Sequence, residues 1–213
     1  MSLHYQDEEI IIYKIVCGPY DNNAYLVVNP WSNESLIIDA PANPERLIQI
    51  AEQTNVKAIL ITHNHVDHIQ GLTDIMSMFD VKVGIGVGDD ETVKSDLKFT
   101  INHGDEINVG SIVLKALLTP GHTSGSTCFL VGKHLFSGDT LFPGGPGRSD
   151  SPEKLGQLLD SISTSLFVLG SHTIFYPGHG EDGDIQTSLQ EYDVFKSKQR
   201  PYGLCGDVRW LDD

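Results

Sequence analysis

The sequence has few cysteines and few basic residues for its length, and each shortage excludes a class of protein. Its three cysteines, Cys17, Cys128 and Cys205, are odd in number and far apart. They therefore form neither a disulfide framework nor a Cys-x-x-Cys metal clip, which favours a reducing cytoplasm. Lysine and arginine number 14 against 29 aspartates and glutamates, for a formal net charge of −15. Such a surface repels nucleic-acid phosphates, so no nucleic-acid partner is expected and a nuclease is disfavoured.

Long apolar runs are also missing. No stretch approaches the roughly 18 apolar residues that a membrane span needs, so no membrane partner is expected. The opening "MSLHYQDEEIIIYKIV" places acids before its apolar run, where a secretory signal would carry a basic region. We therefore expect a cytoplasmic protein that acts on a small molecule. The 213 residues, 39% of them hydrophobic, suit one domain over residues 1–213 and leave the oligomeric state open.

The regular pattern that is present consists of short strands in two groups, with helices between and after them. Strands are predicted where β-branched and aromatic runs are bounded by turn residues. These runs are Ile10–Val16, Ala24–Asn29, Ser35–Asp39, Val56–Thr62, Lys82–Ile85, Glu106–Val109, Ile112–Leu118, Thr127–Val131, His134–Ser137 and Thr173–Tyr176. The order predicts an α/β fold of two sheets with helices on their outer faces.

Helix signals separate these strands. In "ANPERLIQIAEQT", Asn43 is the expected N-cap and Pro44 the first helical residue. In "SDSPEKLGQLLDSI" the expected N-cap is Ser151, directly before Pro152. Apolar residues at helical spacing predict a helix over 69–79, in "IQGLTDIMSMF", and a last helix is expected from 185 to about 195.

The densest chemical signal is "HNHVDH" at 63 to 68, directly after a predicted strand. It contains His63, His65, Asp67 and His68. Neutral imidazole and carboxylate are ligands that zinc prefers, and catalytic zinc sites keep one position open for water. One tight loop does not easily direct all four groups at a single ion. We therefore expect two neighbouring ions, with Asp67 and His68 at the start of the next helix.

Three further donors follow later strands. His122 in "LLTPGHTSGS", Asp139 in "HLFSGDTLF" and His179 in "IFYPGHGED" each come after an apolar strand and small turn residues. Because the same order of apolar strand, small turn residues and donor side chain occurs three times, we predict that these strand ends meet at one edge of the fold and form a metal site there. The histidines that lack this order are excluded from the site: His4, His103, His134 and His172.

The motifs "THNHVDH", "TPGHTSGS", "SGDTLF" and "YPGHG" resemble the successive ligand motifs of the metallo-β-lactamase-fold hydrolases. The resemblance runs from "NNAYLVV" and "LIIDA" to "YPGHG", and it is closest to the short form of the glyoxalase II-like branch, the hydroxyacylglutathione hydrolases. It implies a four-layer αββα sandwich of two mixed sheets. It also implies two divalent metal ions, with zinc expected and iron or manganese as alternatives.

Carried over by position, the resemblance assigns each candidate ligand. His63, His65 and His122 would hold one ion, Asp67, His68 and His179 the other, and Asp139 would bridge the two.

Two more residues receive roles from the same resemblance. Asp39, which ends "SLIID", matches a family aspartate that would brace the ligand loop, with an ordinary turn residue as the alternative. Arg148, in "FPGGPGRSD", lies in a loop that lines the pocket in relatives. It would bind a substrate carboxylate, with bracing of its own loop as the alternative.

The predicted reaction is metal-assisted hydrolysis of a thioester such as hydroxyacylglutathione. Two ions about 3.5–4 Å apart lower the pKa of a shared water, so a bridging hydroxide is the expected nucleophile. Asp67 would orient it and Asp139 would fix the spacing of the ions. Full-length members add a basic helical domain that grips glutathione, so the short form leaves glutathione recognition open. The stretch "GIGVGDD" at 84 to 90 lacks the lysine and spacing of a phosphate loop and is interpreted as a turn.

Two other activities on the same scaffold stay open. A persulfide dioxygenase binds one Fe(II) through two histidines and an aspartate, here His63, His122 and Asp139, and "GPGRSD" resembles the loop after that aspartate. An acyl-homoserine lactonase is chemically close to the thioesterase. A non-catalytic zinc module is disfavoured, because structural zinc sites are usually closed by cysteines. The best-known β-lactamase subclass would carry a cysteine in place of Asp139, and a flavodiiron protein a glutamate in place of His65.

Overall fold

Two mixed sheets form the centre of the fold in a computed structural model that describes residues 3–212. The first sheet has the order β1-β2-β3-β4-β5-β6-β7 and the second β15-β14-β11-β10-β9-β8. The first comprises β1 Leu3–Gln6, β2 Ile11–Cys17, β3 Asn22–Val28, β4 Glu34–Ile38, β5 Asn55–Ile61, β6 Lys82–Gly86 and β7 Lys98–Ile101. The second comprises β8 Glu106–Val109, β9 Ile112–Leu118, β10 Thr127–Val131, β11 His134–Gly138, β14 Ile174–Pro177 and β15 Gly183–Asp184. A small hairpin joins β12 Leu141–Phe142 to β13 Gly145–Pro146.

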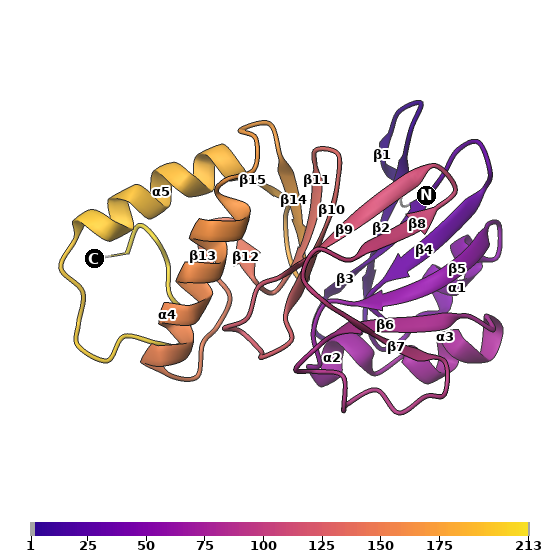
Figure 1. The fold of residues 1–213 in the computed structure, drawn as a ribbon, viewed down its shortest axis with the longest axis horizontal. Coiled ribbons are helices and arrows are strands. Elements are labelled where there is room, and N and C mark those ends of the chain that lie inside the picture. Colours follow the sequence, from indigo (N-terminus) through magenta and orange to yellow (C-terminus); the bar gives the residue numbers. More distant parts are fainter. Residues whose placement is uncertain (1–2, 213) are drawn as a thin grey trace.

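Helices cover the outer face of each sheet (Figure 1). Against the first sheet lie α1 Glu45–Ala51, α2 Val66–Ile69 and α3 Leu72–Met78. Against the second lie α4 Pro152–Ser161, a π-helical turn Ile162–Leu166 and α5 Ile185–Ser197. None of the helices between residues 3 and 212 has the length and apolar character to cross a membrane.

Three apolar clusters separate the four layers. Strand β3 shows why: every residue in it is buried, and alternate side chains enter different clusters. Tyr25 and Val27 pack between the sheets, whereas Leu26 and Val28 pack under the helices of the first sheet. A third cluster joins α4 and α5 to the second sheet around the fully buried Trp210. Because side chains of a strand alternate faces, a strand buried on both sides belongs in the middle of such a sandwich. The predicted αββα architecture is confirmed.

The strand predictions agree with the structure to within two residues, but two helix predictions are wrong in detail. Asn43 does not cap α1; it has a φ of 56°, and Pro44 occupies the cap position without a side-chain hydrogen bond. The helix expected over 69–79 is split into α2 and α3. Gly71 lies at the break: its backbone N–H donates to the carbonyl of Ala40 at 2.8 Å, and a Cβ there would lie 2.1 Å from the carbonyl oxygen of Pro41. Ser151 does cap α4, accepting a hydrogen bond from the backbone N–H of Lys154 at 3.3 Å.

The two sheets approach each other closely where β5 and β11 end. Gly138, the last residue of β11, has a φ of 48°, and a Cβ on it would lie 2.6 Å from the Cβ of Thr62. The backbone N–H of Thr127 donates to the carbonyl of Thr62 at 2.8 Å, and that of Asn23 donates to Gly178 at 2.7 Å. The loops that follow these strands are therefore brought to one edge of the sandwich.

Candidate metal centre

The loop after β5 directs its histidines and aspartate along this edge. His63 and His65 lie in the loop itself, whereas Asp67 and His68 lie in the first turn of α2, as predicted. His122 follows β9, Asp139 follows β11 and His179 follows β14. All seven predicted ligands take part in groups whose donor atoms lie within 4.8 Å of one another. The structure thus brings the four segments that carry these residues to one place.

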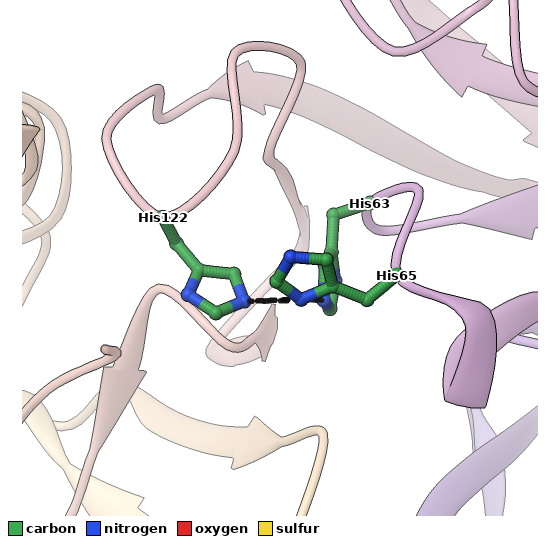
Figure 2. Close-up of side chains that lie close together, drawn as sticks. All are labelled: His63, His65 and His122. Atoms are coloured by element: carbon green, nitrogen blue, oxygen red, sulfur yellow. Dashed lines mark hydrogen bonds between the residues drawn. The ribbon is translucent and has the colours of Figure 1, made fainter. Parts of the chain in front are cut away.

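One group consists of three imidazoles (Figure 2). The Nε2 of His122 lies 3.2 Å from the Nε2 of His63 and 3.0 Å from the Nδ1 of His65, and these two atoms are 3.2 Å apart. Burial, with the neighbouring His68, lowers the pKa of His63 well below its usual range. Burial and His122 lower the pKa of His65. Neutral rings with converging nitrogens are the form in which histidine binds a metal.

The second group mixes imidazole and carboxylate. The Oδ2 of Asp67 lies 3.3 Å from the Nε2 of His179 and 3.6 Å from the Nε2 of His68. Burial disfavours the charged form of His68, but Asp39 and Asp139 outweigh it and raise the pKa of this histidine. The amide of Asn22, which donates to the carboxylate, and the charge of His68 lower the pKa of Asp67 against the opposing effect of burial.

Asp139 stands between the two groups. Its Oδ1 lies 3.5 Å from the Nε2 of His68, and its Oδ2 lies 3.8 Å from the Nε2 of His122 and 3.7 Å from the Nε2 of His179. Burial raises the pKa of Asp139, but His68 and two other histidines reverse this effect and lower it far below its usual range. An ionised carboxylate in this position is within reach of both groups.

Four of the histidines have their Nδ1 occupied by an oxygen atom. His68 donates to Asp39 Oδ2 at 2.8 Å, and His63 pairs with the hydroxyl of Thr62 at 3.0 Å. His122 donates to the carbonyl of Arg148 at 2.8 Å and His179 to that of Tyr20 at 3.0 Å. A hydrogen bond at one ring nitrogen fixes the tautomer and turns the other nitrogen toward the site.

Two buried polar atoms of the site have no hydrogen-bond partner among residues 3–212: the Nε2 of His68 and the Oδ1 of Asp139. Buried polar groups are nearly always partnered, and leaving one without a partner costs about 1–3 kcal/mol. The two atoms lie 3.5 Å apart, and the Nε2 of His68 also lies 3.6 Å from Asp67 Oδ2. A divalent cation there would satisfy both, so the residues fit the metal ions that the donor set predicts.

Asp39 holds both ends of the ligand loop that follows β5. It is buried with a φ of 63°, and its Oδ1 accepts the backbone N–H of Thr62 at 2.8 Å. Its Oδ2 accepts the hydroxyl of Thr62 and the Nδ1–H of His68, each at 2.8 Å. The carboxylate therefore holds the entry to the ligand loop and orients one of its histidines, in the position expected of a bracing residue.

Asn22 contacts the second group, although no sequence motif singled it out. Its Nδ2 donates to Asp67 Oδ2 at 2.9 Å and lies 3.3 Å from the Nε2 of His179. Asn22 belongs to "GPYDNN", which has the composition of any tight turn. In the structure Asn22 begins β3, and only the tertiary fold brings it against residues 67 and 179.

A cavity of about 400 Å³ opens beside His179. Its walls come from the β12–β13 hairpin and from the chain near the C-terminus, and Arg148, Asp207 and Arg209 contribute charged groups. Arg148 lines the cavity, but its guanidinium is exposed and lies 3.2 Å from Asp207. The excluded histidines contribute nothing to the cluster: His103 and His172 are exposed, and His4 pairs with Asp182.

Comparison with known proteins places this architecture and donor set in one family. Residues 17–179 match the model of the metallo-beta-lactamase superfamily. The chain belongs to this superfamily. A probable metallo-hydrolase of Bacillus subtilis (strain 168) is 32% identical over 197 residues, covering 82% of this chain and 92% of that protein. A hydroxyacylglutathione hydrolase of Buchnera aphidicola (subsp. Acyrthosiphon pisum) is 37% identical over 71% of this chain, which spans 62% of that protein.

Solved structures share the fold. The crystal structure of ETHE1 from Myxococcus xanthus is 27% identical with a TM-score of 0.79, over 89% of this chain and 86% of the other. A protein crystallised in a di-iron-bound form is 27% identical with a TM-score of 0.72, over 84% and 97% of the two chains. The protein is therefore a metallo-hydrolase superfamily member whose clustered side chains can hold divalent metal.

Proposed function

We propose that the protein is a dinuclear metal-dependent hydrolase of thioesters, of the hydroxyacylglutathione type, acting in the cytoplasm with zinc as the expected metal. The observation that carries the proposal is the unpartnered Nε2 of His68 beside the unpartnered Oδ1 of Asp139. The three-imidazole group alone would hold one ion without them, so a second ion accounts for both atoms.

Bound in these positions, two divalent ions would lower the pKa of a water and polarise the thioester carbonyl. The protein's own groups would order the reactants. Asp67, held by Asn22, points a carboxylate oxygen into the second group and would orient the attacking water. Asp139 would keep the two groups at fixed spacing, since its oxygens face histidines of both.

Substrate would enter from the cavity beside His179, whose side chain is partly exposed at its mouth. Arg148 lines that cavity, and it would bind a substrate carboxylate by exchanging its contact with Asp207. Exposed ion pairs of this kind contribute only about 0–1 kcal/mol, so breaking the contact between Arg148 and Asp207 costs little free energy. The acidic surface is consistent with a small-molecule substrate rather than nucleic acid.

The test combines metal analysis with a thioesterase assay. We expect two zinc ions per chain and hydrolysis of hydroxyacylglutathione thioesters by the purified protein. In His179→Ala we expect one ion and a loss of about 100-fold or more in kcat, because a Lewis acid supplies several kcal/mol. His172→Ala, at an exposed histidine outside the cluster, is the matched control. Near-normal turnover by His179→Ala would refute the two-metal proposal.

A mononuclear Fe(II) persulfide dioxygenase is the second candidate, and the similarity to ETHE1 favours it. Its iron would use His63, His122 and Asp139, which also lie together here. One iron per chain, with oxygen uptake on glutathione persulfide, would support this candidate. His179→Ala would then have a mild effect, because His179 is outside that ligand set.

A further inference from the structure

The glycine-rich turn after β6 packs directly against the loop that follows His122. A Cβ on Gly86 would lie 2.1 Å from the carbonyl oxygen of Gly125, and one on Gly125 would lie 2.5 Å from the backbone nitrogen of Asp89. Gly88 has a φ of +101°, and a Cβ on it would lie 2.9 Å from the carbonyl oxygen of Ser124. Gly86 and Gly88 of "GIGVGDD" thus permit the close approach of this segment to the loop after His122.

Asp89 lies at the centre of this contact. It is 2% exposed, and its carboxylate accepts three hydrogen bonds. Its Oδ2 accepts the backbone N–H of Asn64 at 3.0 Å and the hydroxyl of Thr123 at 2.6 Å. Its Oδ1 accepts the backbone N–H of Gly125 at 2.9 Å. Hydrogen bonds to an ionised acceptor are stronger than neutral ones, so this carboxylate is a firm anchor.

The donors to Asp89 belong to the two loops that supply the three-imidazole group. Asn64 lies between His63 and His65, and Thr123 follows His122 directly. The second group is held by other residues: Asp39 orients His68, and Asn22 binds Asp67. The hydrogen bonds of the Asp89 carboxylate are therefore made to the stretches that carry the three imidazoles.

We propose that Asp89 is the positioning residue of the three-imidazole group, holding the loops of His63–His65 and His122 at the spacing that an ion needs. This inference rests on the proposed function, since it assigns Asp89 a role toward one of the two ions. It also gives a part in the metal centre to "GIGVGDD", in which residues 84–86 end β6 and only the residues from 87 form the expected turn.

Asp89→Asn is the sharpest variant. The carboxylate accepts hydrogen bonds at both oxygens, whereas an amide accepts at only one and turns N–H donors toward Asn64 and Thr123 or toward Gly125. The side-chain shape is kept while the clamp on at least one loop is lost. Asp90→Asn is the matched control: Asp90 is in the same turn, but its carboxylate accepts from Gly88 and Thr100, outside both ligand loops.

The first readout is the affinity for Zn²⁺, measured by competition with a chelator. It is made in the His179→Ala background, so that the three-imidazole group is the site observed. We expect Asp89→Asn to raise the Kd about 10–100-fold, as for other residues that orient metal ligands. The d–d absorption spectrum of the Co²⁺-loaded variant should change as well. Asp90→Asn should leave both unchanged, and equal effects of the two variants would overturn the proposal.

The second readout uses the metal-free protein. Amide hydrogen exchange at Asn64 and Gly125 should accelerate in Asp89→Asn, while exchange at Ile59 in the middle of β5 stays unchanged. A uniform acceleration would indicate general destabilisation and would refute a positioning role. Thr123→Val, which removes one donor to Asp89, should accelerate exchange at Asn64 to a smaller extent if Asp89→Asn fails to fold. Failure of the wild-type protein to bind two ions would reject the proposed function, while this exchange experiment would still test the clamp.

Discussion

Buried histidines occur at both ends of the sandwich, and the two ends use them differently. Strand β11 begins with His134 and is followed at its other end by Asp139. His134 is 3% exposed, yet its Nδ1 pairs with the hydroxyl of Tyr176 at 2.7 Å and its ring packs against Tyr5. His63 is buried to the same degree, but its Nε2 faces other imidazoles. Burial alone therefore does not distinguish a structural histidine from a ligand; the atoms that its second nitrogen faces do.

The position of the two ends within the fold explains the difference. Strands β5, β11 and β14 each have a parallel neighbour and carry candidate ligands just beyond their carboxyl ends. Ligand sites in α/β proteins form at the carboxyl ends of parallel strands, where several loops begin side by side. His134 stands at the amino end of its strand, where its hydrogen-bond partner is a tyrosine within the same sheet.

The largest contrast is expected between alanine variants of the two ends. His122→Ala removes one of three converging imidazoles, so we expect it to lose the ion of that group and at least about 100-fold in hydrolysis. His134→Ala should keep the full metal content and kcat and lose stability only. Metal analysis and a thioesterase assay on both variants provide the measurement. If His122→Ala and His134→Ala lost similar amounts of metal, the distinction between a metal-binding and a structural histidine would be wrong.

An intermediate effect is expected from Asp39→Asn, which touches no substrate. The amide keeps the shape of the side chain but lacks one acceptor for Thr62 and His68. We expect a loss of about 10–100-fold in metal affinity or activity, the usual effect of replacing a partner of a metal-binding histidine. Asp74→Asn, at an exposed acid of α3, is the control. Wild-type affinity in Asp39→Asn would show that His68 needs no bracing.

The smallest effect on function is expected at His134. Titration of this histidine should still make a measurable contribution to the pH dependence of the free energy of unfolding. Burial, and next the charge of Lys133, lower its pKa from 6.5 to about 4. The folded protein thus favours neutral His134, and this contribution is complete above pH 6.5 and lost as the pH falls toward 4. A shift of this size corresponds to about 3 kcal/mol. In His134→Gln the free energy of unfolding, from urea titrations between pH 7 and 4, should fall less steeply than in the wild type. An unchanged slope would contradict the assignment.

The candidate ligands could be selected from the sequence because each of them has a local signal. Each follows an apolar strand and small turn residues, and side-chain alternation within a strand such as β3 is visible in the letters themselves. The same local signals predicted the Ser151 cap correctly. Features of this kind need no knowledge of the tertiary fold.

The residues that were missed or misread depend on contacts between distant segments. Gly71 interrupts an apolar pattern of helical spacing because Pro41 lies against it. Asn22 and Asp89 look like ordinary turn residues in the sequence. Asn22 contacts Asp67, 45 positions away, and the donors to Asp89 lie 25 to 36 positions away. Periodicity and turn composition report on adjacent residues only, so they carry no information about such pairings.

The most direct test of the account is anomalous scattering from crystals of the metal-loaded protein. We expect two peaks about 3.5–4 Å apart, one beside His63, His65 and His122 and the other beside Asp67, His68 and His179. Asp139 should contact both, and no peak should lie near His134. A single peak held only by His63, His122 and Asp139 would contradict the dinuclear centre.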